Sequence, residues 1–428
     1  AESMSEQVSA QLLSDPRVLG TTAGVLGIMG LIPGMPNFPF LLLAGASGGA
    51  AWWISKQAKE KALARAQAEA RAAQAPPPTS ESKELSWDDL PLVDPVGLEV
   101  GYRLIPLVDK AQGGQLMPRI KGVRKKLSQE LGFLVPAVHI RDNLELAPGA
   151  YRITLMGVTV GEADIHPERE MAINPGQVFG QVQGLPAKDP AFGLDAIWIE
   201  PRLRDQAQSM GYTVVDPNTV IATHLSQVIQ THAHEILGHE EVQQLLQQLA
   251  KAAPKLVEDL VPKLLPMSTV VRVLQNLLAE GIPIRDMRTI AETLAEQAHR
   301  TQNAGVLTAG VRSALSRLIV QKINGLSPDL QIITLAPELE QILLRSVQAS
   351  DDGGAGIEPG LAERLHKGLA DSTQRQEMAG RPAVLLVSAP IRELLARFVK
   401  HTIPRLHVLA YNEVPESMQL RIVGTIGN

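Results

Sequence analysis

The stretch VLGTTAGVLGIMGLIPGMPNFPFLLLAGASGGAAWWI, from Val18 to Ile54, has 37 residues and no charged side chain. A single bilayer span needs about 20 apolar residues. The sequence Pro33-Gly34-Met35-Pro36-Asn37 interrupts the stretch and is typical of a tight turn. We therefore predict a transmembrane helical hairpin over residues 18–54, with two short arms. A buried hairpin inside a soluble protein is the alternative.

The second arm of this hairpin carries features of a packed membrane helix. Gly45 and Gly49 have the small-xxx-small spacing that lets helix backbones approach closely. Trp52 and Trp53 lie where an interfacial aromatic belt is expected. We expect the arms to have helical neighbours.

Basic residues follow the hairpin and predict its orientation. An excess of lysine and arginine close to a span marks the cytoplasmic side. We therefore expect residues 1–17 and 55–428 to be cytoplasmic and only the turn to face outward. The basic residues are Lys56, Lys59, Lys61, Arg65 and Arg71, against Glu60 and Glu69.

The overall composition is that of a folded protein and excludes some functions. The chain has 428 residues, of which 45% are hydrophobic and 20% are charged, so a core of several domains is possible. The net charge of −5 offers no general field for nucleic-acid phosphates, and no nucleic-acid partner is expected. The absence of cysteine excludes disulfides, thiol catalysis and cysteine-ligated zinc. No cofactor is expected.

The segments on both sides of the hairpin are predicted to be helices, the second of which continues into a linker. Residues 1–17 place Met4, Val8 and Leu12 on one face of a short amphipathic helix near the membrane surface. Residues 55–94 begin as an alanine-rich helical stalk and continue as a linker rich in proline and small polar residues.

One aromatic residue lies in this linker. Trp87 is followed by Asp88 and Asp89. The tryptophan is either incidental or an anchor that holds the linker against a folded domain.

The remainder of the chain shows α/β texture with one helical block. Residues Leu98–Ile105, Ala137–Asp142 and Tyr151–Met156 read as strands, and Met117–Leu131 reads as an amphipathic helix whose basic face is solvated. A small α/β insert follows between about Asp164 and Asp216.

The second half of the chain begins with a helix over Pro217–Leu237 and continues as helix from 240 to 324. The last block has a strand at Ala383–Val387, a helix around Ile391–Lys400 and a strand at Leu406–Leu409, which implies parallel pairing. The predicted fold class is thus a multi-subdomain α+β and α/β region: two larger α/β modules, a small α/β insert and an all-helical module, preceded by a transmembrane helical hairpin.

The histidine-rich sequence THAHEILGHE is the best candidate for catalysis. Zinc hydrolases with an H-E-x-x-H motif need two histidines at i and i+4, whereas His234 and His239 are five residues apart. His232 and His239 could share a face but have no carboxylate between them at a suitable spacing. We therefore expect no metal and no catalytic residue, and we keep a membrane-tethered hydrolase using residues 232–239, which include Glu235, as the alternative function.

Several long runs resemble the FlhA family, the large membrane component of the bacterial flagellar type III export gate. The runs span nearly the whole chain, so the resemblance is far more specific than a short motif. They are PGMPNF (33–38), GYRLIPLVD (101–109), VHIRDN (138–143), DPAFGLDAIWIE (189–200), YTVVDPNTVIATHL (212–225), PKLVEDLVP (254–262) and VLQNLLAEGIPIRDMRTIAETLAE (273–296).

The resemblance implies that this chain is the end of a protein of the bacterial inner membrane, with its last two membrane helices, a linker and a cytoplasmic region. It also implies a non-catalytic gate whose cytoplasmic ring, of nine subunits in the family, docks chaperone-substrate complexes and passes export substrates to the membrane channel. Other export-gate and export-ATPase components and the lipid bilayer are the further expected partners. The implied subdomains are 95–167 with 217–237, the insert 168–216, the helical 238–325 and the C-terminal α/β 326–428.

The resemblance also implies a docking dimple between the first two subdomains. Asp189 begins the turn Asp189-Pro190-Ala191-Phe192, which would present an acid and an aromatic ring. Judged on residues alone, the same side chains read as core and turn formers. The positions that match the family's dimple are Pro175, Asp189, Phe192, Val215, Val220 and Thr223, and those expected to dock the linker are Trp87 and Asp89.

Overall fold

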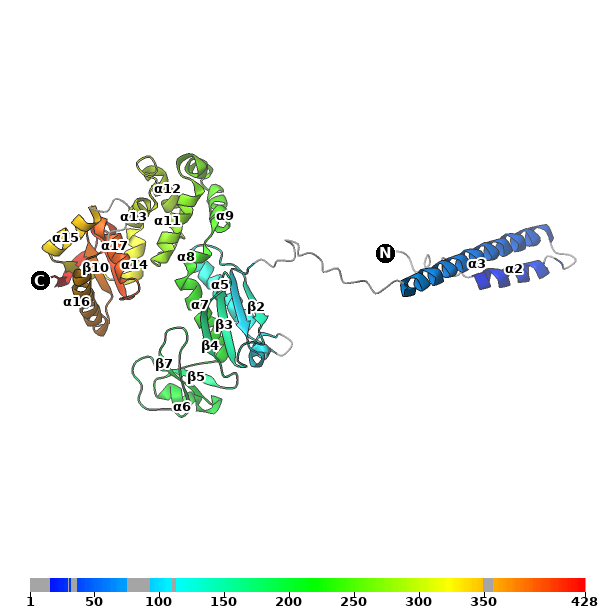
Figure 1. Cartoon of the computed structure of the whole chain (residues 1–428), viewed down its shortest axis with the longest axis horizontal. Coiled ribbons are helices and arrows are strands. Elements are labelled where there is room, and N and C mark those ends of the chain that lie inside the picture. Colours follow the sequence, from blue (N-terminus) through cyan, green and yellow to red (C-terminus); the bar gives the residue numbers. More distant parts are fainter. Residues whose placement is uncertain are drawn as a thin grey trace. The chain divides into compact units, whose positions relative to one another are not determined.

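The structure is a computed structural model that describes residues 16–29, 31, 37–74, 93–109, 113–348 and 357–427 (Figure 1). It divides into two compact units, Ala1–Pro91 and Leu92–Asn428. Three predictions lie outside the described residues. They are the amphipathic segment 1–17 except for its last two residues, the turn at 33–37 except for its last residue, and the linker from 75 to 92 with its anchors Trp87 and Asp89.

The first unit contains two helices that pack against each other, α2 (Pro16–Met29) and α3 (Asn37–Gln74). A Cβ placed on Gly48 would lie 3.8 Å from the Cβ of Ala23, whereas a Cβ on Gly45 or Gly49 would meet no atom within 4 Å, so the close packing predicted at these two glycines is not seen within this unit. Helix α3 runs without interruption for 38 residues, and its second half corresponds to the predicted stalk. Trp52 is exposed, and the Nζ atom of Lys56 lies 5.6 Å from its ring centroid.

No helix in the described residues is both long and apolar enough to cross a bilayer. The predicted pair of transmembrane spans is therefore not confirmed. Helix α2 has 14 residues and is about 21 Å long, whereas the bilayer core is about 30 Å thick. In α3 the apolar part is diluted by Gly45, Ser47, Gly48 and Gly49, and charges begin at Lys56.

The second unit begins with a four-stranded sheet covered by two helices. Its elements are β1 (Val96–Val100), β2 (Val138–Asp142), β3 (Ala150–Leu155), β4 (Val158–Asp164), α5 (Leu116–Leu131) and α7 (Pro217–Thr231). The strand order is β2-β1-β3-β4, with β1 parallel to β2 and all other pairs antiparallel. Leu98, Tyr151 and Leu225 are fully buried in its core. The predicted helix at 117–131 and the strands at 137–142 and 151–156 are confirmed within two residues.

The predicted strand over Leu98–Ile105 is wrong in its second half. A Cβ on Gly101 would lie 2.3 Å from the carbonyl oxygen of Ala147, so the backbone packs too tightly there for a longer strand. The chain instead forms the short helices η2 (Tyr102–Leu104) and α4 (Ile105–Val108).

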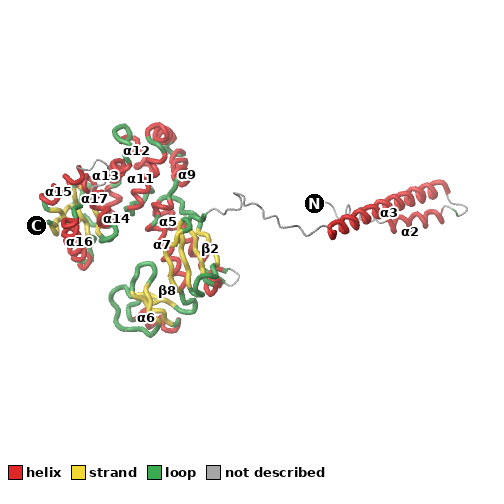
Figure 2. The backbone as a smooth tube through the Cα atoms, viewed as in Figure 1, coloured by secondary structure: helices red, strands yellow, loops and turns green. Residues whose placement is uncertain are grey.

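A small second sheet is inserted between β4 and α7, and Figure 2 shows its yellow strands beside helix α6. The elements are β5 (Glu170–Ile173), β6 (Leu185–Lys188), β7 (Asp195–Ile199), η4 (Pro201–Leu203), α6 (Arg204–Ser209) and β8 (Thr213–Val215). All pairs are antiparallel, in the order β6-β7-β5-β8. The insert has its own small core, which includes Ile199 and Tyr212.

The next part of the chain is helical, as predicted. Its elements are α8 (Ala233–Ile236), α9 (His239–Ala250), α10 (Pro254–Glu258), η5 (Asp259–Leu264), α11 (Met267–Ala279), α12 (Met287–Gln297), α13 (Ala304–Ala314) and α14 (Ser316–Asn324). The apolar face of α11 is buried, and Gly281 follows this helix with φ +71°, which only glycine adopts easily.

The last subdomain is a sheet in which every pair is parallel, in the order β11-β10-β9-β12. Its elements are β9 (Asp329–Leu335), α15 (Pro337–Gln348), α16 (Pro359–Met378), β10 (Ala383–Val387), α17 (Ala389–Val399), β11 (Leu406–Ala410), η6 (Tyr411–Glu413) and β12 (Gln419–Ile426). The predicted parallel unit of β10, α17 and β11 is confirmed. Strand β12 is not among the predicted elements, and most of its side chains are exposed.

Candidate functional site

The turn between β6 and β7 contains an exposed aromatic residue, Phe192, whose backbone is hydrogen-bonded to the buried carboxylate of Asp189. Asp189 is only 2% exposed, and its Oδ2 accepts a hydrogen bond from the backbone N–H of Phe192 at 2.8 Å. The backbone N–H of Asp189 donates to Leu194, and its carbonyl accepts from Gly193, both at 2.8 Å. These bonds close the turn and leave the Phe192 side chain 61% exposed.

The Asp189 carboxylate therefore does not face solvent, in contrast to the prediction that the turn presents both an acid and a ring. Its charge acts on two side chains of the first subdomain, Tyr151 on β3 and His224 on α7. Burial raises the pKa of Tyr151, and Asp189 raises it further. Burial lowers the pKa of His224, and Asp189 opposes that change. The acid of the insert thus acts through its charge on a buried polar pair of the neighbouring subdomain.

Tyr151 and His224 form this pair. The Tyr151 hydroxyl and the His224 Nδ1 are 2.7 Å apart, and the two rings meet edge to face with centroids 5.7 Å apart. Gly161 on β4 lies against the histidine ring, because a Cβ at this position would be 2.8 Å from His224 Cε1 and Nε2. Sequence reasoning did not identify these three residues, since they lie on three separate elements and match no motif.

The other expected dimple residues differ in exposure. Pro175 is exposed, Val215 and Thr223 are half-buried, and Val220 is only 1% exposed. Val220 packs in the core and offers almost no surface to a partner. Thr223 directly precedes His224 on α7, the helix whose histidine feels the charge of Asp189. The convergence of all six residues in one dimple stays a prediction.

Helix α7 begins at a well-defined N-cap close to the insert. Asp216 accepts a hydrogen bond from the backbone N–H of Thr219 at 3.0 Å and forms an ion pair with Arg119 of α5 at 2.8 Å. Burial opposes ionisation of Asp216, but the hydrogen bonds of Thr219 and then the charge of Arg119 outweigh it and lower the pKa. The start of α7 is thereby fixed to α5.

A family model covers almost the whole chain. The FHIPEP family model matches residues 1–419. The chain belongs to the FHIPEP family. It is 47% identical over 426 residues to the flagellar biosynthesis protein FlhA of Yersinia enterocolitica, a match that covers 100% of this chain and 60% of that protein. The predicted resemblance to the FlhA family is confirmed, and the chain spans about three fifths of the length of this relative.

Solved structures share the fold of this FHIPEP-family chain. A chain of the Chlamydia pneumoniae CdsV and CdsO protein complex is 25% identical, with a TM-score of 0.70, and the match covers 79% of this chain and 99% of that one. The nonameric SctV-C of EPEC is 21% identical, with a TM-score of 0.64 and coverage of 79% and 99%. The predicted multi-subdomain α/β architecture is confirmed at this coarse level.

Two histidines of the motif, His232 and His234, lie close to the carboxylate of Glu235. His232 Nδ1 lies 2.8 Å and His234 Nε2 lies 3.7 Å from Oε1 of Glu235, while His239 opens the next helix, α9. No group of three possible metal ligands occurs in the part of the chain that the structure describes. These residues therefore give the hydrolase alternative no support, because a catalytic zinc needs three protein ligands.

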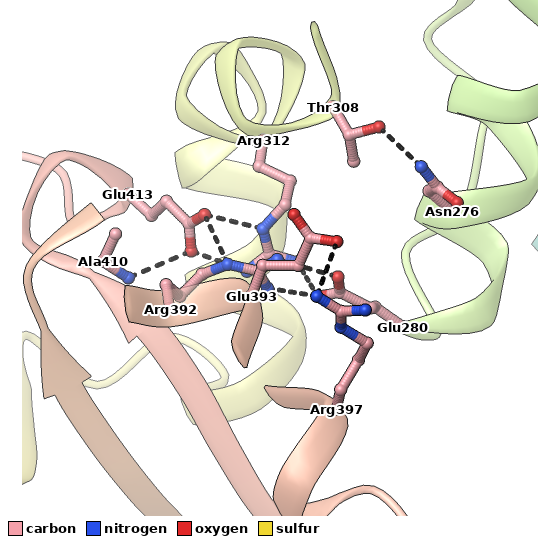
Figure 3. A network of polar contacts seen from close by, with 9 residues as sticks. All are labelled: Asn276, Glu280, Thr308, Arg312, Arg392, Glu393, Arg397, Ala410 and Glu413. Carbon is pink, nitrogen blue, oxygen red and sulfur yellow. Dashed lines mark hydrogen bonds and ion pairs between the residues drawn. The ribbon is translucent and has the colours of Figure 1, made fainter. Parts of the chain in front are cut away.

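A buried ion-pair network joins the helical subdomain to the C-terminal subdomain (Figure 3). Arg312 on α13 donates from Nε and Nη2 to the two oxygens of Glu413, both at 2.6 Å, and from Nη1 to Glu280 at 2.6 Å. Arg392 on α17 also donates to Glu280, in one bond at 2.9 Å. The side chains of Arg312, Arg392 and Glu413 are at most 5% exposed.

The cost of burying the charges of this network is offset by their ionic and hydrogen-bonding partners. Burial opposes ionisation of Glu280, yet the hydrogen bonds and charge of Arg392 outweigh burial and lower the pKa of Glu280. The backbone N–H of Ala410 donates to Glu413 at 3.2 Å, so the carboxylate has partners on both sides (Figure 3). Buried charges are stable only when they are paired in this way. Sequence reasoning missed the network because its members lie far apart in the chain.

Proposed function

We propose that the chain is a non-catalytic component of a flagellar type III protein export gate and docks chaperone-substrate complexes on its inserted subdomain. The observation that carries the proposal is the 47% identity to a flagellar biosynthesis protein FlhA over the full length of the chain. The chain spans only 60% of that relative, so the function proposed for this chain is docking, and no role in the channel or its energy source is proposed for it.

The docking surface is centred on the β6–β7 hairpin. This hairpin carries three exposed apolar side chains, Leu185 on β6, Phe192 in the turn and Leu194 before β7, which are 43%, 61% and 39% exposed. Aromatic side chains that are held rigidly and surrounded by apolar area are typical anchors of protein interfaces. The hydrogen bond to Asp189 supplies the rigidity. The expected partner presents an apolar side chain or helix face to Phe192.

Assembly into a ring is the second part of the proposal. The homologous fold of SctV-C occurs in a nonameric structure, and CdsV occurs in a complex with CdsO. We therefore propose that this chain forms a homo-oligomeric ring, of nine subunits in the family, and contacts further export-apparatus proteins. The roles of Trp87 and Asp89 in linker docking, and residence at the bacterial inner membrane, stay predictions.

The Phe192→Ala variant tests the docking surface. Calorimetry with a purified flagellar chaperone-substrate complex should show at least about tenfold weaker binding, since removal of an interface anchor costs about 2 kcal/mol. The free energy of unfolding should stay within about 0.5 kcal/mol of wild type because the ring is exposed.

Leu326→Ala provides the matched control. Leu326 is 89% exposed and precedes β9 in the C-terminal subdomain, so its truncation should leave chaperone binding unchanged. A folded Phe192→Ala variant that binds as wild type would remove this surface from the proposal.

A further inference from the structure

A cavity of about 450 Å³ lies between the helical subdomain and the C-terminal subdomain. Its walls come from the end of α11, from α13 and α14, and from α17 and β11. A volume of this size is within the range of small-molecule sites in proteins, about 300–1,000 Å³. The buried ion-pair network forms part of its wall, through Glu280, Arg312 and Arg392.

The charges that line this cavity are predominantly positive. Glu280 and Glu393 are the two carboxylates among the lining residues, and Glu413 lies behind the wall as a third. The cationic side chains of the lining are Arg312, Lys322, Arg392, Arg397 and Lys400. Counted with Glu413, the five cations face three carboxylates, which leaves a surplus of two positive charges.

Ion pairing identifies which cations carry the surplus. Arg312 and Arg392 are neutralised within the network by Glu280 and Glu413, and Arg397 lies 3.8 Å from Glu393 (Figure 3). Lys322 donates a hydrogen bond to the carbonyl of Gly281, a neutral acceptor.

Within the described residues no carboxylate lies within 4 Å of the Nζ atom of Lys322 or Lys400. The surplus thus belongs to two lysines that both line the cavity, Lys322 on α14 and Lys400 at the end of α17. Each keeps ammonium protons available for an anionic acceptor.

The charged neighbours of Lys322 are of both signs. Burial lowers the pKa of Lys322, Glu130 opposes this effect and Arg285 reinforces it. Glu130 itself lies 3.7 Å from the Nζ of Lys126. Burial, and after it the charge of Lys322, lowers the pKa of His407 in the cavity wall. An anion in the cavity would favour the charged form of Lys322.

The same cavity also offers apolar surface. Ile319 and Ile323 of α14 lie in its lining, together with Ile403 from the segment after α17. We propose that this cavity binds a small organic dianion, of the phosphate monoester class, whose charged group is held by Lys322 and Lys400 and whose apolar body rests on these isoleucines. The site is separate from the β6–β7 docking hairpin and does not depend on the proposed function.

Calorimetric titration of the purified chain with phenyl phosphate tests this proposal. The buffer should keep a constant ionic strength with chloride, because exposed charges are screened by salt. Phenyl phosphate should bind, and inorganic phosphate should bind more weakly, since it lacks the apolar body. Equal affinity for the two ligands would show a bare anion site and overturn the assignment of an organic ligand.

Charge-removing variants show whether the ligand occupies this cavity. Lys322→Gln and Lys400→Gln should each weaken phenyl phosphate binding about tenfold, because each removes one charge-assisted hydrogen bond. Lys125→Gln, on the exposed face of α5, is the charge-matched control and should bind as wild type. Absence of binding to the wild-type chain, or unchanged affinity in both cavity variants, would overturn the proposal.

Discussion

Asp189 is buried and Phe192 is exposed, yet a 2.8 Å hydrogen bond from the Phe192 N–H to the Asp189 carboxylate makes them one unit. The aspartate acts as a positioning residue, because its buried carboxylate holds the turn in place while the Phe192 ring is exposed. Only the phenylalanine is then free to contact a partner. This arrangement predicts that substitutions at the two positions have different effects on stability.

Asp189→Ala should lower the free energy of unfolding, unlike Phe192→Ala. The substitution leaves the partly buried N–H of Phe192 without its acceptor, which costs about 1–3 kcal/mol. Asp189→Asn keeps an acceptor oxygen and should recover most of this stability. Urea unfolding of the two variants, followed by calorimetry with the chaperone complex, gives both quantities. An Asp189→Ala variant as stable as wild type but unable to bind would instead mean direct contact with the partner.

The burial of Asp189 could not be predicted from sequence. The local pattern Asp-Pro-Ala-Phe correctly indicates a turn. Whether the acid of that turn faces solvent depends on how distant parts of the chain pack around it. The two side chains on which its charge acts, Tyr151 and His224, lie 38 and 35 residues away in the chain. Sequence patterns indicate the periodicity of a single helix or strand, and they do not predict contacts between elements.

The differences between the predicted and the observed secondary structure also arise from packing and from element length. The sequence of residues 98–105 predicts one strand, but tight packing at Gly101 ends the strand at Val100. The uncharged stretch 18–54 correctly predicts the two helices α2 and α3, and the turn predicted between them lies outside the described residues. Its glycines and its short first helix explain why the predicted spans are not confirmed.

One residue of the ion-pair network is weakly indicated by the sequence. On α13, Arg312 follows the buried positions Leu307 and Val311, so it falls on the apolar face of the helix. A cation on an apolar face indicates a buried partner. That partner, Glu413, is 101 residues further along the chain, and no local pattern identifies it.

Stability should fall at mildly acidic pH through His224. Burial lowers its pKa in the folded protein, whereas the unfolded chain binds a proton near the ordinary value of about 6.5. Because the unfolded state then binds more protons, the contribution of His224 is present above this pH and is lost as the pH falls below it. His234 and His407, whose pKa values burial also lowers, act in the same direction.

The measurement is the slope of the urea midpoint against pH, from about pH 7 to about pH 5. His224→Gln should have a shallower slope than wild type because one of the contributing protons is removed. The control is His299→Gln, which changes an exposed histidine in the turn after α12 and should keep the full slope. Identical slopes for wild type and His224→Gln would contradict the assignment.

Arg312→Met should destabilise the protein strongly. It removes the bidentate partner of Glu413 and one partner of Glu280, and breaking a buried ion pair costs about 3–5 kcal/mol because a charge is left unpaired. Arg288→Met, which breaks the exposed pair of Arg288 and Glu292 on α12, should leave the urea midpoint unchanged. If both variants unfold at the wild-type midpoint, the network makes no contribution to stability.

Gly161→Ala tests the packing beneath the docking surface. The added methyl group would lie 2.8 Å from two atoms of the His224 ring and 3.6 Å from a methyl group of Val228. The ring cannot move away without breaking its 2.7 Å hydrogen bond to Tyr151, so the substitution overpacks the core and should cost about 1–3 kcal/mol.

Gly122→Ala is the matched control for Gly161→Ala, because a Cβ at Gly122 on α5 meets no atom within 4 Å and alanine favours helix. A double-mutant cycle with His224→Ala separates the clash from any effect on the strand. Gly161→Ala should cost far less when His224 is already alanine, since the ring that it meets is gone. If the cost of Gly161→Ala is the same in both backgrounds, as urea unfolding would show, the strain lies in β4 itself and not in its contact with the histidine.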